Sequence, residues 1–208
     1  MHASRALTRF LAPLQSAPMK RLFVLLLPLL VLAGCASKPP QLTLEEALLN
    51  PLFAEQYYDM LVDLIVELEI KKDPLLEDKR KKATADEARR DALAKAKEAT
   101  KVQREGTMGG FVPAKEFAKG EVLYRENRLF LGSTFETSPG PSLHLFLSTV
   151  VDPRDTAFPD DTSIDLGRLE SAFGAQQYSV PPMDNPLLYR TVVLFDTKFE
   201  RIYGFAQL

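Results

Sequence analysis

Apolar positions recur at helical spacing after Pro51, where they stand three or four residues apart. This spacing predicts an amphipathic helix that buries one face. The positions are Phe53, Tyr57, Met60, Leu61, Leu64, Ile65 and Leu68. Upstream, Thr43 and Glu46 have the spacing of a capping box, and Asn50 is biased away from helical backbone because a proline follows it. Two helical runs are therefore expected before residue 70.

A further helix is expected after Asp73 and Pro74, which resemble an N-cap followed by proline at the first helical position. Small side chains form its regular face: Ala85, Ala88, Ala92, Ala96 and Ala99. An acidic stripe with a spacing of four residues follows the preceding helix: Glu55, Asp59, Asp63 and Glu67. Opposite charges on consecutive helices favour an antiparallel hairpin over residues 42–105, although each exposed ion pair contributes less than about 1 kcal/mol.

The charge difference between the two helices is large. Residues 41–69 carry seven acidic and no basic side chains, whereas residues 71–105 carry twelve basic and eight acidic ones. The basic helix is interpreted as a solvated spacer. The alternative is a basic arm that contacts an anionic polymer or lipid.

Short apolar runs separated by turn residues follow Gly106, Gly109 and Gly110. These runs have strand character. They cover residues 121–135, 139–150, 178–182 and 190–208. Regularly spaced short strands indicate a compact β-sandwich or a barrel. We predict an antiparallel β-sandwich over residues 106–208, and an α+β class for the chain.

The run 190–208 is predicted to be a closing hairpin. Val192 and Leu194 should face one side of its first strand, while Val193 and Phe195 face the other side. Residues 199–206 should return along a neighbouring strand. Gly204 should allow a bulge or a close backbone approach there.

The N-terminal residues have the pattern of a secretory signal: two basic residues, an apolar run from Leu22 to Leu32, and then small residues. The apolar run is too short for a membrane-spanning helix. The residues Leu32-Ala33-Gly34-Cys35 resemble the lipobox of bacterial lipoproteins. This resemblance implies residues 1–34 as a signal peptide, with Met19 as an alternative start, and residues 35–41 as a lipidated cysteine and tether. An N-terminal membrane helix with an incidental cysteine is the alternative.

The same resemblance implies a location. Ala36 and Ser37, in place of an aspartate after the cysteine, imply an outer-membrane lipoprotein facing the periplasm in a Gram-negative cell. Removing residues 1–35 changes the formal charge from −2 to −6, since 22 basic and 28 acidic residues remain. Such a chain is not attracted to anionic lipid by charge, so the lipid on Cys35 must hold it at the membrane. It also lacks the basic character of nucleic-acid-binding domains.

Four motifs follow one another in the last ninety or so residues. They are residues 140–148 (GPSLHLFLS), 164–169 (IDLGRL), 174–181 (GAQQYSVP), and 191–196 (TVVLFD) with 204–208 (GFAQL). Their order resembles the DM-thirteen family, which is labelled an electron-transfer domain. In that family the final strand carries a tryptophan–cysteine pair whose cysteine is the suspected redox residue. Here these positions hold Phe195 and Asp196, and an aspartate cannot cycle between thiol oxidation states.

Asp196 is expected at a turn with Thr197 and Lys198, where a carboxylate can accept backbone hydrogen bonds. A catalytic aspartate is the alternative. His144 lies in a strand, on the side opposite Leu143, so it is either a hydrogen-bonded histidine or an axial haem ligand, with Met183 as a candidate second ligand.

Four aspartates crowd one loop and are a candidate calcium site with hard oxygen ligands: Asp155, Asp160, Asp161 and Asp165. They lack the spacing and the central glycine of an EF-hand. A zinc site made of histidines and cysteines is excluded, because His144 is accompanied only by His2, and Cys35 is the sole cysteine.

Two functions remain. The first is a lipid-anchored envelope protein whose β-domain is a non-enzymatic module that binds a partner protein, a polymer or a small ligand. The alternative is the redox or haem-carrying accessory that the family label implies. The interpretation favours the first because position 196 is an aspartate, and no catalytic residue is assigned.

Overall fold

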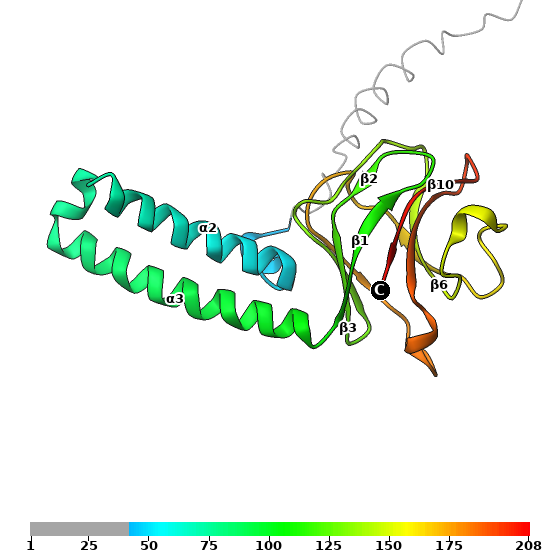
Figure 1. Ribbon diagram of the computed structural model, residues 1–208, viewed down its shortest axis with the longest axis horizontal. Coiled ribbons are helices and arrows are strands. Elements are labelled where there is room, and N and C mark those ends of the chain that lie inside the picture. Colours follow the sequence, from blue (N-terminus) through cyan, green and yellow to red (C-terminus); the bar gives the residue numbers. More distant parts are fainter. Residues whose placement is uncertain (1–41) are drawn as a thin grey trace, which may run out of the picture. The chain divides into compact units, whose positions relative to one another are not determined.

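The computed structural model describes residues 42–208, which form one compact unit. The expected signal peptide, Cys35 and the tether lie outside the described residues. Within residues 42–208 a helical pair precedes an antiparallel β-sheet, so the α+β prediction is confirmed (Figure 1). None of the helices in this part of the chain has the length and hydrophobicity that a membrane crossing requires.

The helices begin at hydrogen-bonding caps. Helix α1 (Leu44–Ala47) has the expected capping box between Thr43 and Glu46. Helix α2 (Pro51–Ile70) begins after Asn50, whose side chain accepts hydrogen bonds from the backbone of the first turn. The prediction that Asp73 starts the long helix is wrong. Asp73 caps the short 3₁₀ helix η1 (Pro74–Glu77), and α3 (Lys79–Arg104) begins after a second cap, Asp78, whose extended backbone interrupts the helix.

Helices α2 and α3 pack antiparallel, as predicted. At one end of the pair, Nε2 of Gln103 donates a hydrogen bond to the carbonyl oxygen of Pro51 at 2.9 Å. At the other end, Arg89 and Glu69 form an ion pair at 2.9 Å. The buried face of α3 consists largely of small side chains, which allow a close approach: Ala92, Ala96 and Ala99.

Eight strands form one antiparallel sheet in the order β7-β6-β9-β10-β1-β3-β4-β8. Their bounds are β1 (Thr107–Pro113), β3 (Glu121–Arg125), β4 (Arg128–Leu131), β6 (Leu143–Ser148), β7 (Ile164–Arg168), β8 (Gln176–Ser179), β9 (Thr191–Asp196) and β10 (Arg201–Gln207). The short strands β2 (Ala118–Lys119) and β5 (Glu136–Thr137) pair separately. The edge strands β7 and β8 also lie close to each other, so the sheet forms a nearly closed barrel.

The barrel is a single sheet, whereas a sandwich would have two. The difference arises from β1, which pairs with both β10 and β3 and so joins the two halves. Gly109 and Gly110 lie within this strand. A Cβ atom at Gly109 would lie 2.0 Å from the carbonyl oxygen of Gln207. Glycine is therefore required where the two backbones approach.

Apolar side chains fill the barrel interior. They include Phe111, Val122, Leu129, Leu131, Phe135, Leu145, Leu147, Val192 and Leu194. A second cluster covers the outer face of β6, β9 and β10: Phe146, Val193, Phe195, Ile202 and Phe205. The alternation predicted for the last hairpin is therefore confirmed. The predicted irregularity near Gly204 is confirmed as well, because the β9–β10 register shifts between Ile202 and Gly204.

The helical pair contacts the sheet near the start of α2. Leu52 packs with Leu123 and Phe130 in a third apolar cluster. Nδ2 of Asn50 donates hydrogen bonds to the carbonyl oxygens of Leu131 and Gln176, at 2.8 and 3.3 Å. Asn50 thus caps the helix and links it to strands β4 and β8.

Candidate functional site

Asp196 ends β9 and is fully buried, with a relative exposure of 0%. Its Oδ1 accepts hydrogen bonds from the backbone N–H groups of Lys198 and Phe199, both at 2.9 Å. Its Oδ2 accepts a third from the backbone of Ser142 at 3.1 Å. Asp196 therefore lies at the expected turn, and it also connects that turn to the loop before β6.

Asp196 is closely packed on the side that faces Gly140. A Cβ atom at Gly140 would lie 2.5 Å from Oδ2 of Asp196 and 2.7 Å from the hydroxyl oxygen of Tyr203. That hydroxyl donates a hydrogen bond to the carbonyl oxygen of Pro139 at 3.2 Å. We call Gly140, Ser142, Asp196 and Tyr203 the polar corner, and its packing indicates a structural role.

The charge state of the polar corner agrees with this role. Burial raises the pKa of Asp196, but the three backbone N–H donors and the nearby Lys198 charge outweigh burial and hold the pKa below its ordinary value. Burial and the Asp196 charge raise the pKa of Tyr203. Asp196 is therefore a stabilised anion at neutral pH, which does not suit a residue that exchanges protons.

His144 lies on the outer face of β6, opposite Phe195 in the register with β9. Its Nδ1 is 2.9 Å from Oδ2 and 3.1 Å from Oδ1 of Asp165. The same carboxylate accepts a hydrogen bond from the backbone of Gly167 at 2.8 Å. His144 is thus a hydrogen-bonded histidine with an oriented ring, and its Nε2 makes no hydrogen bond within residues 42–208.

The candidate second haem ligand lies elsewhere. Met183 packs against the cluster that fills the barrel interior, whereas His144 lies on the outer face of the sheet. The two side chains therefore do not form a ligand pair.

The four loop aspartates are not gathered around one point. Asp165 pairs with His144, and Asp160 accepts hydrogen bonds from Thr162 and Ser163 in its own turn. Asp155 ends the short helix η2 (Pro153–Asp155). In the described part of the chain, no group of three or more histidine, cysteine, aspartate or glutamate side chains is arranged to hold a metal ion. The structure therefore does not bring the four aspartates of the candidate calcium site together.

A pocket of about 530 Å³ opens on the outer face of the sheet, beside Phe195. Its lining residues are Ala114, Lys115, Arg154, Asp155, Thr156, Ala157, Phe158, Phe195, Glu200 and Ile202. Phe158 and Phe195 meet edge to face, with ring centroids 5.3 Å apart. Sequence reasoning missed this pocket because three separate segments build it, around residues 114, 154–158 and 195–202.

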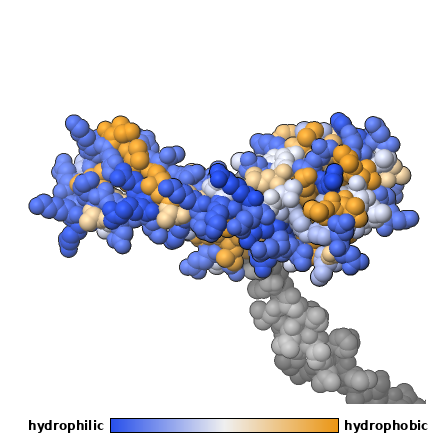
Figure 2. Space-filling view, turned by 60° about the horizontal axis from the view of Figure 1, so that its bottom comes forward, coloured by the Kyte–Doolittle hydropathy of each residue, from blue (hydrophilic) through white to orange (hydrophobic). Residues whose placement is uncertain are grey.

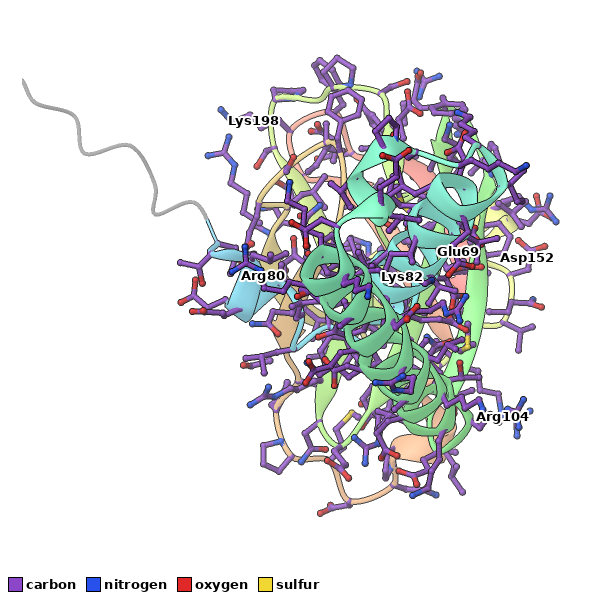
Figure 3. All side chains as sticks on the ribbon, turned by 90° about the vertical axis from the view of Figure 1, so that its left-hand side faces the viewer. Glu69, Arg80, Lys82, Arg104, Asp152 and Lys198 are labelled. Carbon is purple, nitrogen blue, oxygen red and sulfur yellow. The ribbon has the colours of Figure 1, made fainter. Side chains whose placement is uncertain are left out.

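Charged side chains surround the aromatic part of the pocket. Arg154 lies over the Phe205 ring, 5.3 Å from its centroid, and pairs with Asp152, whose pKa it lowers to about 2. Figure 3 shows Asp152 projecting outward from its loop. Lys115 and Glu200, in contrast, form no ion pair within residues 42–208. The pocket thus combines the aromatic side chains of Phe158 and Phe195 with charged side chains of both signs.

These features define the β-rich part as a curled antiparallel domain with a closed polar corner and an open outer pocket. Residues 111–208 match the family described as Electron transfer DM13. This part of the chain is therefore a DM13 domain, and the resemblance seen in its motifs is confirmed. Searches of curated proteins and of solved structures found no match.

Proposed function

We propose that the protein is an envelope binding protein, held at the membrane by lipid on Cys35, whose DM13 domain binds a small ligand without transforming it. The observation that carries this proposal is the pocket beside Phe195. Its volume of about 530 Å³ lies within the usual range for small-molecule sites, roughly 300–1,000 Å³. It adjoins the strand whose family redox position holds the buried Asp196.

The lining residues suggest the ligand's chemistry. Phe158 and Phe195 offer apolar and aromatic contact, which favours a ligand with a flat apolar body. Arg154 is already neutralised by Asp152, so Lys115 is the cation available to an anionic group. A molecule with an aromatic body and one acidic group fits both features when that group lies beside Lys115 and away from Asp155 and Glu200, which also line the pocket.

Anilinonaphthalene sulfonate has this chemistry and serves as the probe. Its fluorescence should rise saturably on binding to the chain from residue 36 onward, which includes the whole described unit. Lys115→Ala and Phe158→Ala should each weaken binding about tenfold, equivalent to 1.4 kcal/mol. Leu187→Ala, at an exposed apolar position outside the pocket, is the matched control and should change nothing. Unaltered binding by both pocket variants would remove the basis of the proposal.

The lipid anchor rests on the lipobox residues and on Cys35 being the sole cysteine. Cys35→Ser should leave an unprocessed precursor that incorporates no labelled fatty acid. Normal labelling of this variant would contradict the anchor, and it would leave the pocket proposal standing.

Electron transfer, the activity in the family description, is the second candidate. The observation in its favour is the His144–Asp165 contact, because a carboxylate that orients an imidazole is a common partner of metal-binding histidines. Against it, Asp196 offers no thiol and Met183 lies on the other face of the sheet. A visible absorption band of a bound chromophore that disappears in His144→Ala would reverse this ranking.

A further inference from the structure

Helix α2 carries an apolar surface that neither α3 nor the sheet covers. A shallow groove of about 500 Å³ runs along it, lined by Tyr57, Met60, Leu61, Asp63, Leu64 and Glu67. Met60 is 63% exposed and Leu64 is 53% exposed. We call these six residues the α2 strip. Figure 2 shows hydrophobic residues reaching the surface of the helical part.

The α2 strip borders the face that holds the hairpin together, and its half-buried member Leu61 stands one helical turn before that face's Ile65. Ile65 on that face is buried. Glu69 on the same face is partly exposed and pairs with Arg89 of α3. Isolated exposed apolar residues are ordinary on a protein surface, but a contiguous row of them marks an interaction site. The spacing of the apolar members at 57, 60, 61 and 64 is suited to contact along a helical partner.

The charges of α2 restrict the partner. Residues 51–70 contain five acidic and no basic side chains. Asp63 and Glu67 line the groove, and Asp59 stands one helical turn before Asp63. Glu67 pairs with Lys71, whereas Asp59 and Asp63 form no ion pair within residues 42–208. A second α2 from another copy would bring like charges to this groove, and an anionic lipid surface would be repelled.

We propose that the α2 strip is a docking site for a basic amphipathic helix of a partner protein. Apolar side chains of that helix lie along Tyr57, Met60 and Leu64, while its lysines and arginines face Asp59, Asp63 and Glu67. Electrostatic complementarity of this kind sets partner choice and speeds association. The site is independent of the pocket beside Phe195.

The test uses a labelled synthetic helix of about 18 residues, with leucines on one face and lysines on the other, long enough to be helical when bound. The matched peptide has glutamates in place of lysines. Fluorescence anisotropy should show saturable binding of the basic peptide to the chain from residue 36 onward, and about tenfold weaker binding of the acidic one. Added salt should weaken the basic complex.

Protein variants locate the binding. Met60→Ser and Leu64→Ser should each weaken the basic peptide about tenfold, whereas Leu93→Ser on α3, a position that is 40% exposed, should not. The double change Asp63→Lys and Glu67→Lys should reverse the preference toward the acidic peptide. Circular dichroism checks that every variant is folded.

Two results would overturn the proposal. One is equal binding by the wild type and the strip variants, since the peptide would then bind elsewhere. The other is a dimer in sedimentation equilibrium that Leu64→Ser dissociates, because a second copy would then occupy the strip.

Discussion

The carboxylate of Asp196 gathers backbone N–H groups from two segments that are far apart in sequence, the β9–β10 turn and the loop before β6. A thiol at this position would be a weak acceptor and would carry no charge at neutral pH. Asp196 therefore holds the two segments in a fixed arrangement that a thiol could not maintain in the same way. Gly140 and Tyr203 complete the polar corner, which is packed so closely that position 140 has no room for a side chain.

Asp196→Asn should lower the free energy of unfolding by about 1–3 kcal/mol. The amide oxygen can keep the bonds from Lys198 and Phe199, but the amide nitrogen then faces the N–H of Ser142, so two buried donors oppose each other. Urea denaturation measures the change. Asp184→Asn, on an exposed loop, is the control and should be neutral.

The same variant should change the response to acid. Because the pKa of Asp196 is lowered in the folded state, its contribution is fully present above the ordinary value of 3.8 and is lost as the pH falls through the lower folded pKa. The wild type should thus lose stability in this acidic range more steeply than Asp196→Asn. Parallel curves for the two proteins would show that the carboxylate contributes nothing as an anion.

Gly140→Ala should cost about 1–3 kcal/mol, because its new methyl group overlaps Asp196 and Tyr203. Gly110→Ala in β1 is the matched control, since a Cβ atom there has no neighbour within 4 Å. Thermal unfolding compares the two variants. Equal melting temperatures would mean that the polar corner relaxes freely.

At the scale of elements, the sequence predicted those features that depend on interactions between residues close together in the chain. The capping box at Thr43, the helix after Pro51 and the alternating faces of β9 all follow from spacing and hydrogen-bonding chemistry. Strand β1 could not be predicted this way, because Gly109 is required by a distant strand. The pocket and the polar corner were missed for the same reason, since their residues meet only after the strands have paired.

Asn50→Asp tests the connection between α2 and the sheet. The carboxylate can still accept the cap hydrogen bonds, but it cannot donate to the carbonyl oxygens of Leu131 and Gln176. We expect a loss of about 1–3 kcal/mol in denaturant unfolding, since the buried carbonyls lose their donor. Asp78→Asn, at the cap of α3, keeps its acceptor and should be close to neutral. An unchanged free energy of unfolding in Asn50→Asp would show that the link between α2 and the sheet does not contribute to stability.

At the scale of the whole molecule, the helical segment and the barrel share part of their apolar surface. Leu123 is fully buried on the outer side of the sheet, where Leu52 of α2 covers it together with Phe130. The rest of the helical pair projects into solvent and carries charged side chains such as Arg80 and Arg104 (Figure 3). The β-domain is therefore expected to fold alone, but at reduced stability.

A fragment of residues 106–208 should retain β-sheet circular dichroism and unfold with a free energy lower by about 2–5 kcal/mol, because Leu123 and Phe130 become exposed. Leu52→Ala in the longer chain should reproduce much of this loss, about 2–4 kcal/mol, whereas Leu49→Ala at an exposed position should not. A disordered fragment would mean that the helices are essential to the barrel. A fragment as stable as the longer chain would mean that they are dispensable.

The place of β10 in the sheet has a consequence for the order of events during biosynthesis. This strand stands between β9 and β1, so without residues 201–207 the sheet consists of two pieces, β7-β6-β9 and β1-β3-β4-β8. A ribosome makes the joining strand after all the others, and both pieces keep an unpaired edge until then. The eight-stranded sheet therefore cannot be completed before residues 201–207 have been made. If the chain is exported through a translocation channel, as the proposed anchor requires, the sheet stays incomplete until β10 has been released.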